Sequence, residues 1–155
     1  MVDIERLRRK TIFEGLTDEQ LDSLAAQTQE RHYAAGDVVI RAGETGERVY
    51  VIERGCVEVL GPSAETGGEP PVFARLSRGR TDEGVGDFFG EFCLFDLEPR
   101  TADVVAREAT VLLELGRESL FDLFERDGEL RITVALNVAR VLAHRLRAAN
   151  REPRE

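Results

Sequence analysis

One acid and one base stand at the two ends of an apolar run within residues 86–106, GDFFGEFCLFDLEPRTADVVA. Glu91 opens the run directly after Gly90, and Arg100 follows the proline that closes it. Residues 92–95 are expected to form one or two helical turns. Pro99 ends this segment, because a proline disfavours helix at the residue before it. A helix start exposes unpaired backbone N–H groups, and glycine lets another atom approach closely, so this segment is predicted to bind an anion.

The charges on the two side chains predict which anion fits. The guanidinium of Arg100 offers a planar fork of donors that matches phosphate oxygens. Glu91 would repel an anion, and it is useful beside one only when it accepts hydrogen bonds from neighbouring hydroxyl groups. An acid and a base in this arrangement therefore indicate a ribose phosphate as the ligand. Singly, Glu91 could complement a helix dipole and Arg100 could pair with a nearby carboxylate. Together, and beside Gly90, they favour binding.

The elements that must position this segment begin with helices. Residues 4–30 show apolar spacings near 3.6 in two pieces, and Thr17 with Gln20 predicts a capping box. Short β-rich runs separated by glycines follow at residues 38–40, 49–52 and 56–60. The sequence Glu53-Arg54-Gly55 predicts a tight hairpin between the last two of these runs.

Further strands are expected beyond a Gly/Pro-rich loop at residues 61–71. They are predicted at residues 72–76, 102–106 and 111–115. Many short strands at regular spacing indicate a barrel or a sandwich.

The C-terminal part is predicted to return to helix. A short helix contains Leu120 and Phe124, and Asp127 is expected to cap the long helix that follows. One face of that long helix carries an apolar stripe: Ile132, Ala135, Leu136, Ala139, Leu142, Ala143 and Leu146. The stripe either packs on the barrel or pairs with a second copy of the chain.

Composition restricts the function classes. A chain of 155 residues fits one domain, no apolar run is long enough for a membrane span, and a formal charge of −9 disfavours nucleic-acid binding. The late arginines, Arg145 among them, are interpreted as solvated positions near a helix C-terminus. Cys56 and Cys93 are expected to be buried thiols, with no metal site. We expect a cytoplasmic protein, because the basic N-terminus is not followed by an apolar signal core. We expect no catalytic activity, since no nucleophile is paired with a base.

The segment FGEFCLFDLEPRTADVV resembles the phosphate-binding cassette of cyclic-nucleotide-binding domains, whose pattern runs F-G-E-x-small-L and then P-R-(small or Thr)-A. The N-terminal part of the chain and LNVARVLAHRLRAAN near its end also resemble the family, so the resemblance covers essentially the whole chain. It implies a β-roll or jelly-roll-like barrel of about eight short strands, similar to the effector domain of catabolite activator-like proteins. One domain over 1–155 would comprise N-terminal helices (1–30), a barrel (31–116) with the cassette at 89–102, and C-terminal helices (117–150).

The resemblance also implies roles for individual residues. Glu91 would accept a hydrogen bond from the ribose 2′-hydroxyl, and Arg100 would bind the cyclic phosphate together with the backbone N–H groups of Gly90 and Cys93. Thr101 matches the position whose hydroxyl favours guanine in cGMP-responsive members, and Ala102 completes the cassette. Ala149 or Asn150 of the final helix would lie near the base.

Three hypotheses follow from these observations. The first is a stand-alone cyclic-nucleotide sensor, binding cAMP in preference to cGMP, that signals through its C-terminal helix to a protein partner or to a second copy of itself. No helix-turn-helix follows the last helix, so direct DNA binding is not expected. The second is a barrel-shaped interaction module that has lost the ligand, motivated by Cys93 where alanine is usual and by an insertion at residues 80–85. The third is a regulatory piece of a longer channel or enzyme.

Overall fold

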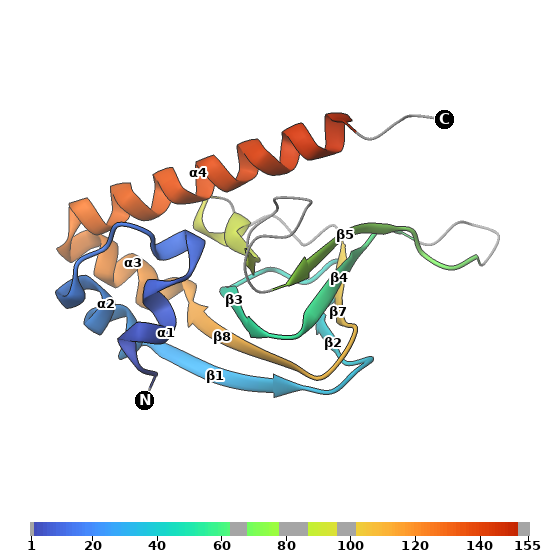
Figure 1. The fold of residues 1–155 in the computed structure, drawn as a ribbon, viewed down its shortest axis with the longest axis horizontal. Coiled ribbons are helices and arrows are strands. Elements are labelled where there is room, and N and C mark those ends of the chain that lie inside the picture. The colour runs from blue at the N-terminus through green and yellow to red at the C-terminus, as the bar shows by residue number, and fades with distance from the viewer. Residues whose placement is uncertain (1, 63–67, 78–86, 96–101, 152–155) are drawn as a thin grey trace.

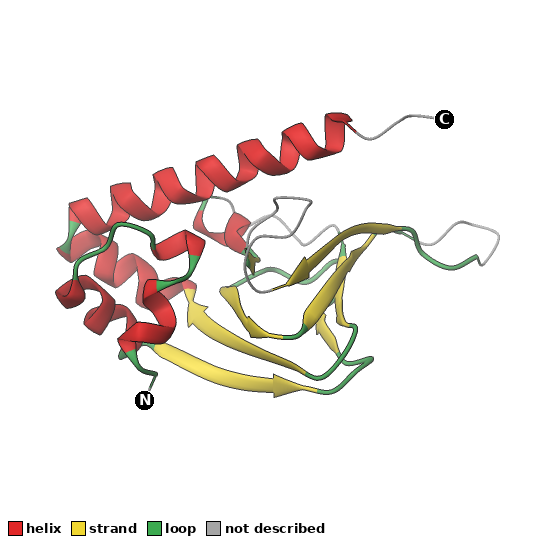
Figure 2. Ribbon diagram, viewed as in Figure 1, coloured by secondary structure: helices red, strands yellow, loops and turns green. Residues whose placement is uncertain are grey.

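In the part of the chain that the structure describes, the strands form two four-stranded sheets, and helices gather at one end of them (Figures 1 and 2). The computed structural model describes residues 2–62, 68–77, 87–95 and 102–151. The helical elements there are α1 (Ile4–Arg8), η1 (Thr11–Phe13), α2 (Asp18–Ala25), η2 (Glu91–Leu94), α3 (Arg117–Arg126) and α4 (Gly128–Arg151). The strands are β1 (Thr28–Tyr33), β2 (Val38–Ile40), β3 (Arg48–Arg54), β4 (Cys56–Leu60), β5 (Val72–Ser77), β6 (Phe88–Phe89), β7 (Asp103–Ala106) and β8 (Thr110–Gly116).

All strand pairs are antiparallel, in the orders β1-β8-β3-β6 and β2-β7-β4-β5. One apolar cluster, which includes Ile52, Val57, Phe89, Val104 and Leu112, draws its side chains from both sheets. The predicted jelly-roll-like barrel with flanking helices and a long C-terminal helix is therefore confirmed.

A second and larger cluster joins the helices to the sheet that contains β3 and β8. Its buried members come from four parts of the fold: the N-terminal helices (Leu7, Phe13, Leu21, Leu24), β3 and β8 (Val49, Val51, Leu113, Leu115), β6 with η2 (Phe88, Cys93), and α3 with α4 (Leu120, Phe124, Leu130, Val134, Val138). The segment before Arg100 thus shares a core with the last helix, because Phe88 and Val138 belong to the same cluster.

The N-terminal region matches its prediction except at its end. The backbone N–H of Gln20 donates to Thr17 Oγ1 over 3.2 Å, and the Thr17 N–H donates to Gln20 Oε1 over 2.9 Å, which completes the capping box. Helix was expected to reach residue 30, but β1 begins at Thr28. The sequence of β1 is TQERHY and most of its side chains are exposed. Its extended state is set by its pairing with β8, which a local apolar pattern does not reveal.

The predicted hairpin at residues 53–55 is wrong. β3 pairs with β6 and β8, whereas β4 pairs with β5 and β7, so the turn at Gly55 carries the chain from one sheet to the other. Gly55 has a φ of 97°, and a Cβ added there would lie 2.5 Å from Thr110 Oγ1. The glycine is needed for this close crossing rather than for a two-residue hairpin turn.

Helix α4 is the longest of the described helices; it begins at the helical end of the molecule and extends well beyond the other helices (Figure 1). Asp127 caps it as predicted, since the Leu130 N–H donates to Asp127 Oδ1 over 3.0 Å. The buried face of α4 is not the predicted stripe: it carries Leu130, Val134, Val138 and Val141. Three of the four large members of the stripe are exposed instead, namely Ile132, Leu136 and Leu146. The fourth, Leu142, is partly buried and packs against the larger apolar cluster. The helix therefore has two apolar faces, and the packed one is rich in valine.

A buried asparagine anchors the first half of α4. Asn137 Nδ2 donates to the carbonyl oxygens of Ile12 and Glu14 over 3.0 and 2.8 Å. These bonds fasten α4 to the η1 segment. None of the described helices is both long and apolar enough to cross a lipid bilayer.

Candidate functional site

The segment that carries Glu91 is held from two sides. β6 pairs with β3, and the ring of Phe89 stacks on that of Tyr50 with centroids 4.9 Å apart. Gly90 follows with a φ of 79°, a left-handed backbone conformation that side chains disfavour, and η2 begins at the next residue. The predicted helical turns are thus present as a single 3₁₀ segment whose first residue is Glu91.

Glu91 points inward and forms an ion pair with a residue of α4. Its side chain is 5% exposed, and Arg145 Nη1 donates to Glu91 Oε1 over 2.9 Å. Arg145 Nη2 also donates to the carbonyl oxygen of Phe88, and the guanidinium carbon lies 5.0 Å from the centroid of the Phe88 ring. The last helix is therefore bonded directly to the acid that the sequence singled out.

The electrostatic environment of Arg145 is that of a desolvated cation with acidic neighbours. Burial lowers the pKa of Arg145, and the negative charges of Glu91 and Asp87 raise it in opposition. An arginine remains protonated in proteins under such shifts. Glu91 thus faces a full positive charge from which most water is excluded.

Arg145 was interpreted from sequence as a solvated position, and its environment contradicts that interpretation because its side chain is only 20% exposed. A signal was available: Arg145 follows the buried residues Val138 and Val141 at intervals of seven and four, so it continues the buried face of α4.

Cys93 is buried within η2, as predicted, whereas Cys56 is only half-buried. The Cys93 N–H donates to the carbonyl oxygen of Gly90 over 3.4 Å, and its own carbonyl accepts from Arg117 Nε over 2.8 Å. Arg117 begins α3, so both C-terminal helices contact the cassette region.

The structure describes two of the four remaining predicted site residues. Arg100 and Thr101 lie outside the described residues. Ala102 is half-buried immediately before β7, and Asn150 is exposed near the end of α4. The structure therefore brings Gly90, Glu91 and Cys93 together in one turn, while Asn150 stands apart from it on another element.

Two aromatic residues of this segment are on the surface. Phe92 and Phe95 are 61% and 60% exposed, whereas Phe88 is buried. The 3₁₀ geometry of η2 explains the difference, because only some of its side chains can face the core, and Glu91 and Cys93 take the inward positions.

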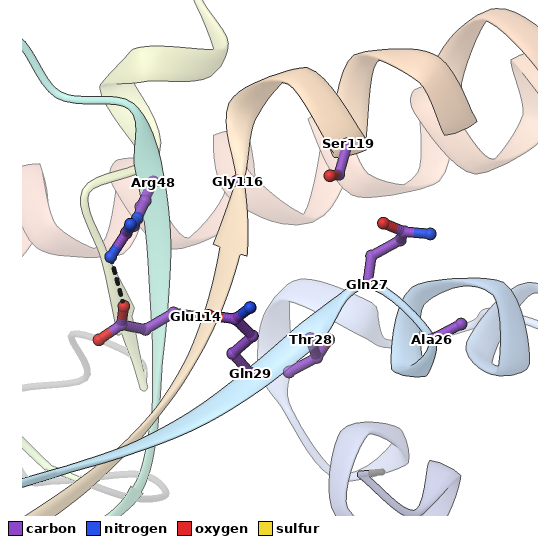
Figure 3. A pocket seen from close by; sticks show the side chains of 8 residues that line it. All are labelled: Ala26, Gln27, Thr28, Gln29, Arg48, Glu114, Gly116 and Ser119. Carbon is purple, nitrogen blue, oxygen red and sulfur yellow. Dashed lines mark hydrogen bonds and ion pairs between the residues drawn. The ribbon is translucent and has the colours of Figure 1, made fainter.

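A separate cavity of about 270 Å³ lies where β1, β8 and the start of α3 meet, as Figure 3 shows. Glu114 is one of the residues that line it, and its carboxylate accepts hydrogen bonds from Tyr33 Oη over 2.5 Å and from Arg48 Nη1 over 3.1 Å. Arg31 Nε lies 3.3 Å from the same carboxylate. This acid is therefore neutralised by residues of the neighbouring strands. None of the predicted site residues that the structure describes lines the cavity. Within the described ranges, no cluster of His, Cys, Asp or Glu is suited to hold a metal ion.

Comparison with known proteins agrees with this geometry. The cyclic nucleotide-binding domain family matches residues 30–127. A cyclic AMP receptor protein of Thermus thermophilus is 34% identical over 146 residues, which cover 94% of this chain and 62% of that protein. A cGMP-dependent protein kinase of Caenorhabditis elegans is 34% identical over 114 residues, or 73% of this chain and 14% of the kinase.

The fold recurs in a cyclic nucleotide-binding domain from Methylobacillus flagellatus, with a TM-score of 0.77, 21% identity and coverage of 96% of this chain and 79% of that one. The chain spans about three-fifths of the length of the Thermus protein and a much smaller part of the kinase. The family match, the shared fold and the buried acid at the start of η2 agree: the chain belongs to the cyclic nucleotide-binding domain family.

Proposed function

We propose that this domain binds cAMP, in preference to cGMP, in the cassette at residues 89–102. The observation that carries the proposal is the burial of Glu91 at the first position of a glycine-led turn. A buried carboxylate needs hydrogen-bond donors, and a ribose hydroxyl is one that a ligand can bring.

The cyclic phosphate is assigned to Arg100 and to the backbone N–H groups of Gly90 and Cys93. The phosphate would share or replace the long 3.4 Å hydrogen bond that the Cys93 N–H donates to the Gly90 carbonyl oxygen. Thr101 and Ala102 complete the cassette, and Asn150 is assigned to the base. A micromolar ligand requires about 8 kcal/mol, and a hydrogen bond to a charged group contributes roughly 1.5–3 kcal/mol. Arg100, Glu91 and the amides can therefore supply a large part of that free energy.

Isothermal titration calorimetry with cAMP and with cGMP tests the proposal directly. We expect heat with both nucleotides and the lower dissociation constant with cAMP. Arg100→Ala is expected to weaken cAMP binding by about tenfold to a hundredfold. The absence of heat with either nucleotide at high micromolar protein would contradict the proposal and favour an interaction module that has lost its ligand.

We further propose that the domain is a regulator rather than an enzyme, and that it acts through α4. A ligand changes the position of a helix only to the extent that it binds one position better than another. The ion pair between Glu91 and Arg145 gives the site a direct connection to α4 through which such a preference can act. With a formal charge of −9, the chain is not assigned direct contact with DNA.

The exposed face of α4 supports a second copy of the chain as one partner. Its apolar residues Ile132, Leu136, Ala139, Ala143 and Leu146 are separated by alternating intervals of four and three, the spacing of a coiled-coil seam. Leu136→Glu is expected to convert a dimer into a monomer in sedimentation experiments. A wild-type chain that sediments as a monomer at high micromolar concentration would refute this part of the proposal.

A further inference from the structure

The exposed side of α4 combines an apolar seam with charges of one sign. The seam consists of Ile132, Leu136, Ala139, Ala143 and Leu146. Its three large members are 59–63% exposed, and a row of exposed apolar side chains on one face indicates an interaction surface. Residues 130–151 contain five arginines and no acidic residue, although the whole chain has a formal charge of −9. This part of α4 is therefore a basic segment of an acidic chain.

The heptad positions along α4 identify the charges that would face a partner helix. With Leu136 at an a position and the rest of the seam at a and d, Arg140 and Arg147 both fall at e, beside the seam. Both arginines are exposed. Arg140 Nη1 donates to Asn137 Oδ1 over 3.3 Å, and the Arg140 side chain is still 57% exposed. Two cations thus border one edge of the seam.

A second copy of the chain can cover the seam but does not match these charges. In a parallel coiled coil, the e residues of one helix face the g residues of the other. The g positions of α4 are Ala135, Leu142 and Ala149, so a second α4 offers no acid to either arginine. An antiparallel pair brings e positions against e positions, and therefore arginine against arginine, which is unfavourable. Self-pairing leaves both cations without a partner across the interface.

An acidic amphipathic helix matches both the seam and its charged edge. Its apolar face would cover the seam, and glutamates at its g positions would lie opposite Arg140 and Arg147. An extended polyanion, such as a nucleic acid or an anionic membrane, fits less well. The rest of the chain is acidic, so it repels a negative surface that extends beyond α4.

We infer that the exposed side of α4 is a docking surface for an acidic amphipathic helix of another protein, which the seam binds through apolar contacts and Arg140 and Arg147 select by charge. The inference rests on the proposed action of the domain through α4, and not on nucleotide binding itself. A second copy of the chain competes for the same seam, so self-association and partner binding exclude each other.

Two model peptides test this surface by fluorescence anisotropy with the full chain. Both span about four heptads, with leucine at the a and d positions and glutamine on the outer face. They differ only at the two g positions opposite the arginines, which carry glutamate in one peptide and lysine in the other. We expect the glutamate peptide to bind about tenfold more tightly, and we expect this preference to shrink as salt is added.

Variants of the chain show whether the preference comes from the two arginines. Arg140→Glu combined with Arg147→Glu is expected to reverse it, and the corresponding pair of glutamine substitutions is expected to abolish it. Arg131→Glu is the matched control: Arg131 is exposed on the same helix but lies at a c position, which faces away from a partner. It is expected to leave the ratio of the two dissociation constants within about twofold of the wild type. Leu136→Glu is expected to prevent binding of both peptides.

The outcomes separate this inference from nucleotide binding, because the peptides are titrated without nucleotide. A wild-type chain that does not bind the glutamate peptide would overturn the inference, as would a preference that the Arg140 and Arg147 substitutions leave unchanged. A self-associated chain that the glutamate peptide does not dissociate would identify a second copy as the occupant. Co-sedimentation with phosphatidylserine vesicles in place of peptide binding would identify a membrane surface, and either result would overturn the inference as well. Charge-dependent peptide binding by a chain that binds neither nucleotide would support the docking surface and contradict the proposed nucleotide site.

Discussion

Replacing Asn137 with alanine tests how α4 is fastened to the rest of the domain. The substitution removes the two hydrogen bonds to the carbonyl oxygens of Ile12 and Glu14, of 3.0 and 2.8 Å, at a residue that is buried. Each lost bond costs about 1 kcal/mol, and leaving a buried acceptor unpaired raises that cost. Alanine returns roughly 0.6 kcal/mol through its higher helix propensity. The free energy of unfolding is therefore expected to fall by about 2–3 kcal/mol.

Urea denaturation followed by circular dichroism measures this loss, at one fixed protein concentration because self-association would change the apparent stability. The midpoint of thermal unfolding is expected to fall by roughly 5–10 °C. Asn150→Ala makes the same chemical change at an exposed position of α4 and is expected to change the free energy by less than about 0.5 kcal/mol. A loss below about 1 kcal/mol in Asn137→Ala would refute the view that these bonds hold the helix.

Three further predictions concern other positions. Gly90→Ala places a side chain at a φ of 79° and is expected to lower the free energy of unfolding by about 1–2 kcal/mol in urea titrations; an unchanged midpoint would show that the turn relaxes without cost. Tyr33→Phe removes the hydroxyl that donates to the buried Glu114 and is expected to cost about 1–3 kcal/mol in the same assay, and a neutral result would contradict the importance of that bond. The hydrogen bond from the Leu130 N–H lowers the pKa of Asp127. The ionised Asp127 therefore stabilises the fold above the unfolded pKa of about 3.9, and this stabilisation is lost as the pH falls through the folded pKa. The difference in unfolding free energy between wild type and Asp127→Asn is expected to be largest near neutral pH and to shrink below about pH 4.

Local signals were sufficient to predict much of this fold. The Thr17–Gln20 capping box and the Asp127 cap depend on residues only three positions apart, and both are present. The turn at Gly90 and Glu91 was equally local, since a glycine before the run and a proline after it limit where a short helix can form.

The features that were missed depend on partners distant in sequence. β1 is a strand because it pairs with β8, more than 70 residues later, and the turn at Gly55 joins two sheets rather than two neighbouring strands. Which apolar face of α4 packs depends on the residues of the N-terminal helices and of β3 and β8 that share its core cluster. The burial of Arg145 follows from that choice, so its contact with Glu91 was not predicted either.

The spacing of the two anchors on α4 has a mechanical consequence. Asn137 and Arg145 are eight residues apart, or about 12 Å along the helix axis, and the last described residue lies about 21 Å beyond Asn137. If α4 pivots as a rigid rod about Asn137, a displacement of about 2 Å at Arg145 becomes roughly 3.5 Å at the last described residue of the helix. The converse also holds: a force applied at the end of α4 acts about 21 Å from Asn137, whereas the bond from Arg145 to Glu91 resists it at only about 12 Å.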